Sequence, residues 1–210
     1  MDAFASSPYL HIGGDESDAT KPEDYVYFIE RVAKIVDSLG KRMMGWDDIT
    51  AANLPQNAVA QHWIKPENAA AAIAQNLDVV MSPAPKAYLD MKYDSLTQLG
   101  LSWAAFIEVD SAYLWSPATY VTGMQREHLL GIEAPLWSET IKNLAEIEQL
   151  LFPRLLGYAE IGWTPDSLRN WSSYRQRLGA QGERLELMEV NFYRSPLVEW
   201  STQRDTLVKD

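Results

Sequence analysis

The 210-residue sequence contains no cysteine, so it can form neither disulfides nor thiolate metal sites. It also lacks any apolar run near the ~18 residues of a membrane span. Basic residues are few: 18 Lys and Arg stand against 29 Asp and Glu, giving a net charge of −11. Because phosphate binding needs clustered Lys and Arg, we expect no nucleic-acid or membrane partner. The first residues show no signal peptide, and a cysteine-free chain fits either a cytoplasmic or a secreted bacterial protein, so the localisation stays open.

Hydrophobic residues make up 47% of the chain and charged residues 22%, which is typical of a globular protein. The length fits one domain or a large piece of one. Eight Trp and ten Tyr are many for this length. Aromatic faces can stack on sugar rings or bases, and they also fill cores, so the count alone leaves both uses open.

Short apolar runs alternate with longer helical patterns along the chain. The expected strands are 9–15, 41–48, 58–63, 78–83 and 131–138, and the expected helices are 22–38, 66–75 and 143–158. Repeated strand–helix units imply right-handed crossovers and a parallel sheet. The expected fold class is therefore α/β.

Polar and aromatic residues follow the carboxyl ends of several strands, which favours a (β/α)8 barrel over a doubly wound sheet. No G-x-G-x-x-G loop supports the doubly wound alternative. Five strands leave the barrel about three strands short. We expect residues 1–165 to form the carboxyl-terminal part of a barrel, with a long irregular insertion at 84–128. Residues 166–210 are expected to form a carboxyl-terminal helix and tail packed on it.

The stretch YLHIGGDES ends a predicted strand with two glycines and two adjacent acids, Asp15 and Glu16. The glycines allow a turn, so both acids could face one site. One carboxyl group could then donate a proton while the other stays ionised. A solvated acidic loop is the plain alternative. A metal site built on His11, Asp15, Glu16 and His62 is a weaker one, because His11 and Asp15 lie four apart on a strand, which is not a chelating spacing.

HIGGDE resembles the His-x-Gly-Gly-Asp-Glu signature of family 20 glycoside hydrolases, the β-N-acetylhexosaminidases, and of their actinobacterial members in particular. Six further segments match in family order: GWDD (45–48), QHW (61–63), YLDMKY (88–93), LGLSW (99–103), EAPLWSET (133–140) and FPRLLGYAEIGWTP (152–165). The resemblance implies the carboxyl-terminal part of a (β/α)8 TIM barrel, about strands 4 to 8 with their helices.

The resemblance also implies an exo-acting, retaining hydrolase that removes terminal β-linked GlcNAc or GalNAc. Chitin-derived oligosaccharides and host glycans are equally compatible substrates. In this chemistry the substrate's own acetamido oxygen attacks the anomeric carbon and forms an oxazolinium intermediate. By motif position, Glu16 would be the general acid and base. Asp15 would orient the acetamido group, and Tyr88 would donate a hydrogen bond to its oxygen.

The remaining matched positions would bind the sugar. Tryptophans would line the acetamido pocket, stack on the ring or flank the leaving group, and acids would accept hydrogen bonds from hydroxyls: Trp46, Trp63, Trp137, Trp103, Asp90 and Glu139. Asp48 stands where the family more often has Glu, and we interpret His62 as structural. We expect no cofactor and no metal.

One part of the family pattern has no match in the chain. An Arg that grips sugar hydroxyls and a His–Asp pair that supports the catalytic Glu would precede the HIGGDE motif, which sits near residue 1. We therefore expect the chain to begin partway through a barrel, to have little or no activity alone, and to associate with copies of itself or with a missing amino-terminal barrel half. The alternatives to an enzyme are a non-catalytic glycan-binding module and a self-assembling half-barrel.

Overall fold

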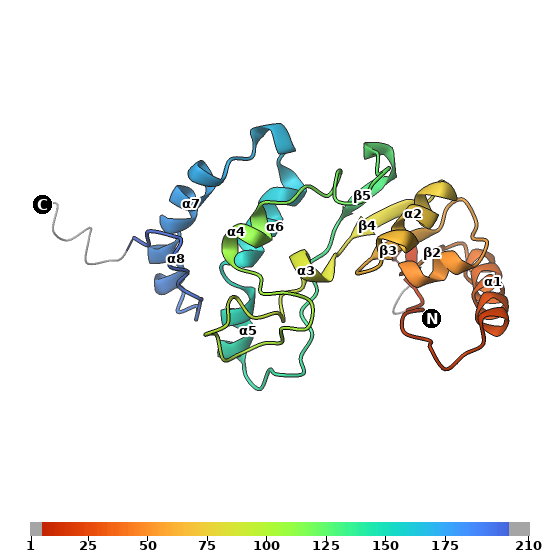
Figure 1. Cartoon of the computed structure of the whole chain (residues 1–210), viewed down its shortest axis with the longest axis horizontal. Helices are drawn as coiled ribbons and strands as arrows, with labels where there is room; N and C mark the ends of the chain where they lie inside the picture. Colours follow the sequence, from red (N-terminus) through yellow and green to blue (C-terminus); the bar gives the residue numbers. More distant parts are fainter. Residues whose placement is uncertain (1–5, 202–210) are drawn as a thin grey trace, which may run out of the picture. The chain divides into compact units, whose positions relative to one another are not determined.

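The computed structural model describes residues 6–201 (Figure 1). Its sheet has five parallel strands in the order β1-β2-β3-β4-β5. The strands are β1 (Tyr9–His11), β2 (Arg42–Trp46), β3 (Val59–His62), β4 (Asp78–Met81) and β5 (Leu129–Ile132). A parallel sheet whose strands alternate with helices confirms the predicted α/β class.

The chain divides into two compact units. The first comprises the described residues up to Pro83 together with Pro117–Glu133, and it holds the whole sheet. The second comprises Ala84–Ser116 and the described residues from Ala134 onward. Each unit therefore draws on two separate stretches of sequence.

Helix α1 (Pro22–Ser38) begins and ends where the sequence predicts. Proline at its first position needs no hydrogen-bond partner there, and two acids follow it in the first turn, where negative charge is favourable. Ile29, Ala33 and Val36 recur at helical spacing and are buried. Their side chains pack α1 against the rest of the first unit, where α1 contacts β2.

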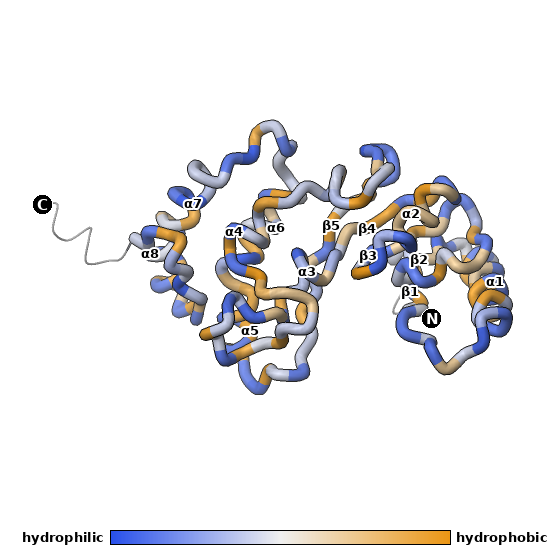
Figure 2. Tube along the Cα trace, viewed as in Figure 1, coloured by the Kyte–Doolittle hydropathy of each residue, from blue (hydrophilic) through white to orange (hydrophobic). Residues whose placement is uncertain are grey.

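The centre of the first unit is well buried and includes polar side chains such as Gln61 and His62 of β3. All four residues of β3 are buried, as expected of a parallel strand covered on both faces. Helix α2 (Pro66–Ala74) contacts β3 and β4, and its buried residues are alanines, so the helix can approach the sheet closely. Figure 2 shows the apolar residues along β4 and the mixed pattern along α1.

The structure corrects three predicted elements. β1 ends at His11 instead of residue 15, because Gly13 and Gly14 have φ values of 72° and 104°, which extended chain cannot adopt. β5 covers 129–132 instead of 131–138. The predicted helix 143–158 divides into α5 (Leu144–Leu151) and α6 (Arg154–Trp163), because Pro153 disfavours a helical conformation at Phe152.

The second unit is mainly helical. Besides α5 and α6 it contains α3 (Ala84–Ala87), α4 (Val109–Tyr113), α7 (Trp171–Gly179) and α8 (Gly182–Leu187). Helices α4 and α6 lie side by side (Figure 1). Tyr113 and Tyr174 stack with ring centroids 4.1 Å apart, which joins α4 to α7. Within residues 6–201, no helix is both long and apolar enough to cross a membrane.

Candidate active site

The two acids of the HIGGDE segment lie on a turn that follows β1. Gly13 and Gly14 have positive φ, and so does Glu16, at 51°. A non-glycine residue in this region costs on the order of 1–3 kcal/mol and is typical of functional sites. Asp15 and Glu16 are both exposed. The turn therefore presents two solvated carboxylates beyond the carboxyl end of β1, an edge strand of the described sheet.

Glycine is required in this turn because other groups approach closely. A Cβ on Gly14 would lie 2.6 Å from Cγ2 of Ile49, and one on Gly45 would lie 2.8 Å from the Gly13 carbonyl oxygen. A Cβ at either distance would force neighbouring atoms to shift, the side chain of Ile49 in the first case and the Gly13 backbone in the second. The glycines of HIGGDE and of GWDD therefore fit together as one packed unit.

A polar network runs across the carboxyl ends of four strands. The Gly13 N–H donates to Nδ1 of His11 over 3.1 Å, which leaves Nε2 as the donor to Oε1 of Gln61, also at 3.1 Å. Nε2 of Gln61 then donates to Ser82 Oγ and to Glu133 Oε1, each over 2.9 Å. His11 thus supports the turn and links it to Gln61 of β3.

Each tryptophan of the first unit contacts a residue of another matched motif. Trp46 meets His11 edge to face, with ring centroids 5.7 Å apart. The indole N–H of Trp63 donates to Oδ2 of Asp48 over 2.9 Å. Asp48, which stands where the family more often has Glu, therefore orients a predicted sugar-binding ring.

His62 and Asp47 form a buried pair beside these tryptophans. Nδ1 of His62 lies 2.7 Å from Oδ2 of Asp47, and both side chains are almost completely buried. Burial raises the pKa of the Asp47 carboxyl, and its hydrogen bond with His62 opposes that rise. The pair lies at the start of the 3-10 helix η2 (Asp47–Ala51) and joins it to β3.

In the second unit, Tyr88 lies among the other predicted aromatic residues. Its ring is 3% exposed and lies 6.1 Å from Trp103, edge to face, and 6.2 Å from Trp137. The two tryptophans are half-exposed, at 52% and 41%. Such a set can offer an apolar wall and one hydroxyl to a ligand.

Asp90 is the most unusual acid of the second unit. Its side chain is buried, and neither carboxylate oxygen makes a hydrogen bond of good geometry with the residues that the structure describes. Burial raises its pKa, nearby backbone amides including that of Trp137 lower it, and the charge of Glu139 raises it further. A buried acceptor without a strong partner is suited to a ligand's hydroxyl.

The segment that carries Tyr88 and Asp90 is clamped by its backbone. The Leu89 N–H donates to the Pro135 carbonyl over 2.7 Å, and the Leu101 N–H donates to the Asp90 carbonyl over 2.8 Å. A Cβ on Gly100 would lie 2.7 Å from that same Asp90 oxygen. Tight packing thus fixes this loop, although the sequence predicts only an irregular insertion there.

The predicted site residues therefore form two groups, one in each unit. Asp15, Glu16, Trp46 and Trp63 belong to the first; Tyr88, Asp90, Trp103, Trp137 and Glu139 belong to the second. Sequence reasoning missed Tyr25, Gln61, Asp48 and Glu133. Gln61, Asp48 and Glu133 stand inside segments that match the family, so the sequence carried a signal for these three. Nothing in the sequence pairs Tyr25 on α1 with the Gly-Gly turn.

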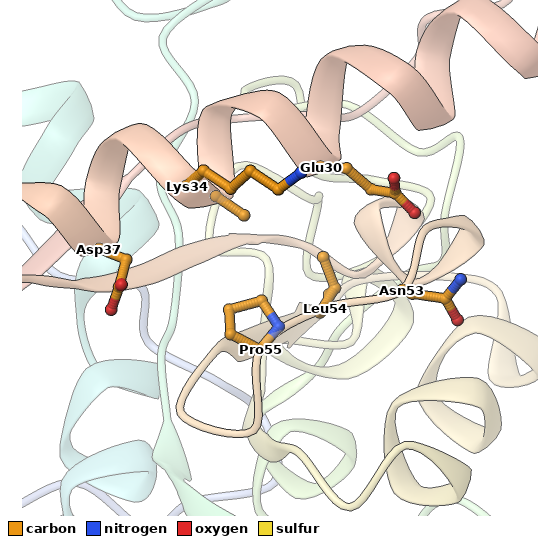
Figure 3. Close-up of a pocket in the computed structure, with 7 residues that line it drawn as sticks. Glu30, Lys34, Asp37, Asn53, Leu54 and Pro55 are labelled. Carbon is orange, nitrogen blue, oxygen red and sulfur yellow. The ribbon is translucent and has the colours of Figure 1, made fainter.

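The first unit also has a cavity of about 380 Å³ on another face. It lies between α1 and the segment after η2, and its wall includes Glu30, Lys34, Asp37 and Asn53 (Figure 3). None of the residues predicted for the site lines it. In the range 6–201 no group of three or more His, Asp or Glu residues is arranged to hold a metal ion.

A parallel α/β sheet with exposed paired carboxylates and tryptophans after its strands is typical of carbohydrate-active α/β proteins. Residues 17–166 match the family described as glycosyl hydrolase family 20, catalytic domain. The chain belongs to this family. The matched range begins directly after Glu16.

Named relatives agree with this membership. The chain is 36% identical over 201 residues to a β-N-acetylhexosaminidase of Cellulomonas fimi, covering 94% of this chain and 40% of that protein. It superposes on the family 20 β-N-acetylhexosaminidase of Streptomyces coelicolor A3(2) with a TM-score of 0.89 at 40% identity, covering 93% of this chain and 41% of the other. A mutant Streptomyces plicatus β-hexosaminidase in complex with GlcNAc gives a TM-score of 0.90 at 40% identity. The chain therefore spans about 40% of the length of these relatives.

Proposed function

We propose that the protein carrying this chain is an exo-acting β-N-acetylhexosaminidase that removes terminal β-linked GlcNAc or GalNAc with retention of configuration. The observation that carries the proposal is the Gly13–Gly14 turn, which exposes Asp15 and Glu16 in a member of family 20. The names of the relatives support it. The product GlcNAc bound to the Streptomyces plicatus relative supports an N-acetylhexosamine-terminated oligosaccharide as the partner.

The proposed chemistry uses the acetamido oxygen of the substrate as nucleophile. Glu16 protonates the leaving oxygen and then accepts a proton from the attacking water. Asp15 orients the acetamido group and stabilises the positive charge that develops on its nitrogen. Tyr88 donates a hydrogen bond to the acetamido oxygen, which holds it in line with the anomeric carbon.

The other predicted residues bind the sugar and its leaving group. Trp46, Trp63 and Trp137 enclose the acetamido methyl group or stack on the ring, and Trp103 flanks the leaving group. Asp90 and Glu139 accept hydrogen bonds from ring hydroxyls. The buried, poorly partnered carboxylate of Asp90 supports such a role, because a sugar hydroxyl would supply the donor that it lacks.

We also propose that residues 1–165 are about strands 4 to 8 of a (β/α)8 barrel and that residues 166–210 form a helical tail on it; residues 1–5 and 202–210 of these ranges lie outside the described residues. The support is the strand order, which follows the sequence without reversal, as in a singly wound sheet. β1 and β5 each have one neighbour in the described sheet. Unpaired edges favour association with another barrel part or with a second copy.

Substrate assistance provides the test of the proposed function. The protein, expressed from its complete reading frame, should hydrolyse an aryl β-N-acetylglucosaminide and should not hydrolyse the matching β-glucoside, which lacks the acetamido nucleophile. NMR of the first-formed sugar should show the β-anomer. Equal rates on both glycosides, or inversion at the anomeric carbon, would contradict the proposal.

Replacing Tyr88 by Phe should lower kcat by about 10²-fold, the loss typical of one preorganised hydrogen-bond donor. The ring and its contacts with Trp103 and Trp137 remain, so we expect the thermal unfolding midpoint to change little. Steady-state kinetics on the aryl N-acetylglucosaminide measure the effect. A variant with wild-type kcat would exclude this role for Tyr88.

A further inference from the structure

The turn that presents the two acids needs support from outside itself. Glu16 keeps a φ of 51°, and the two glycines before it can adopt many conformations. Such a backbone conformation persists only where contacts with the surrounding structure hold it. Side chains outside the turn must therefore hold it in place.

Tyr25 of α1 makes a short contact with this turn. Its hydroxyl donates to the carbonyl oxygen of Gly14 over 2.6 Å, from a half-buried position. A Cβ on Gly14 would lie only 3.3 Å from the same hydroxyl oxygen. Tyr25 therefore holds Gly14 both by a hydrogen bond and by close packing. Gly14 is two residues before Glu16.

The hydroxyl of Tyr25 remains a donor throughout the range in which a hydrolase works. Burial, together with the negative charges of Asp48, Asp15 and Asp47, raises its pKa to about 12. The hydrogen bond to Gly14 is thus independent of pH near neutrality.

The opposite side of the turn is also tied down. The Gly13 N–H donates to His11 Nδ1 over 3.1 Å, and the Trp46 N–H donates to the Gly13 carbonyl over 3.0 Å. These bonds fix Gly13 to β1 and β2, whereas Tyr25 fixes Gly14 to a helix. Tyr25 therefore links α1 to the segment that carries the acids by a hydrogen bond.

We propose that Tyr25 is a positioning residue for the Glu16 carboxyl, acting through the Gly14 carbonyl. The proposal rests on the proposed function of Glu16 as general acid. Without the hydroxyl, Gly14 can rotate and Glu16 can relax toward an ordinary φ, which moves its carboxyl away from the leaving oxygen. Proton transfer depends steeply on such geometry, whereas binding of the sugar does not.

The test compares leaving groups in the Tyr25→Phe variant. For an aryl N-acetylglucosaminide with a weakly acidic phenol, which needs protonation, kcat/KM should fall about 10-fold or more, with KM within about 2-fold. For the 2,4-dinitrophenyl glycoside, which leaves without a proton, kcat/KM should fall less than about 3-fold, because kcat/KM covers the steps up to departure of the phenol and not the later attack of water that Glu16 also assists. A merely structural loss would lower both rates alike.

Tyr27→Phe is the matched control, because Tyr27 lies on the same helix and is 65% exposed. It should leave both rates unchanged. Equal losses on the two glycosides in Tyr25→Phe, or no loss on either, would overturn the proposal.

Hydrogen exchange separates this proposal from the proposed function. Amides of Gly14, Asp15, Glu16 and Ser17 should exchange at least several-fold faster in Tyr25→Phe and at the wild-type rate in Tyr27→Phe. If the wild-type protein hydrolyses neither glycoside, the proposed function fails. Unchanged exchange would then refute the support of the turn by Tyr25, and faster exchange would retain it.

Discussion

Glu16→Gln is expected to lower kcat on an aryl N-acetylglucosaminide with a weakly acidic phenol by about 10³-fold. A positioned general acid contributes roughly 10²- to 10⁴-fold, and an amide can neither give a proton to the leaving oxygen nor accept one from water. Because Glu16 is exposed, the free energy of unfolding should change by less than about 0.5 kcal/mol. Steady-state kinetics and urea unfolding measure the two quantities.

The same variant separates an enzyme from a glycan-binding module. Gln has the shape of Glu, so affinity for GlcNAc, measured by calorimetry, should stay within a few-fold of the wild type. Glu127→Gln, an exposed acid of the 3-10 helix η3 (Arg126–His128), is the control and should leave both kcat and affinity unchanged. Binding without hydrolysis in the wild type would favour the module. A Glu16→Gln variant with wild-type kcat would remove Glu16 from the mechanism.

Arg154→Met is expected to lower the free energy of unfolding by about 3–5 kcal/mol, the largest effect on stability that we predict. The guanidinium is completely buried. Its Nη1 donates to the Met91 carbonyl over 2.8 Å and to the Ile107 carbonyl over 3.2 Å. Its Nη2 donates to the carbonyls of Leu89 and Leu150 over 2.6 and 2.9 Å. Methionine fills similar space and leaves these acceptors buried without donors.

A second lost contact contributes to the decrease in the free energy of unfolding of Arg154→Met, and the substitution should also affect catalysis. The guanidinium lies over the Tyr93 ring at 3.9 Å, a favourable cation–π contact that Met would lose. The carbonyls of Leu89 and Met91 belong to the segment that carries Tyr88 and Asp90, so kcat should fall as well. Arg154 therefore stabilises the second unit and also holds the segment whose side chains are predicted to contact the sugar.

Two variants calibrate the Arg154 measurement. Arg175→Met, on the exposed side of α7, should change the free energy of unfolding by no more than about 0.5 kcal/mol. Arg154→Lys keeps the charge and loses the planar fork, so it should recover only part of the loss. Urea unfolding gives all three values. A loss below about 1 kcal/mol in Arg154→Met would contradict the assigned role.

Part of this arrangement could be predicted because it is local. The bounds of α1 follow from Pro22 and from the spacing of apolar residues, and the sequence predicted them correctly. The HIGGDE segment identified the family through residues adjacent in the chain. Strand ends were less predictable: β1 stops at His11, because positive φ at two glycines is a backbone conformation that composition alone does not assign.

The sequence by itself determined the α/β class, the family and the identity of the candidate acids, because each depends on periodicity or on contiguous motifs. Only the tertiary structure decided which side chains support those residues. Tyr25 meets Gly14, Asp48 orients Trp63, and Arg154 holds the segment after Tyr88, across separations of 11, 15 and up to 65 residues. Such pairs arise from packing between elements, and hydrogen bonds between distant residues leave no period in the chain.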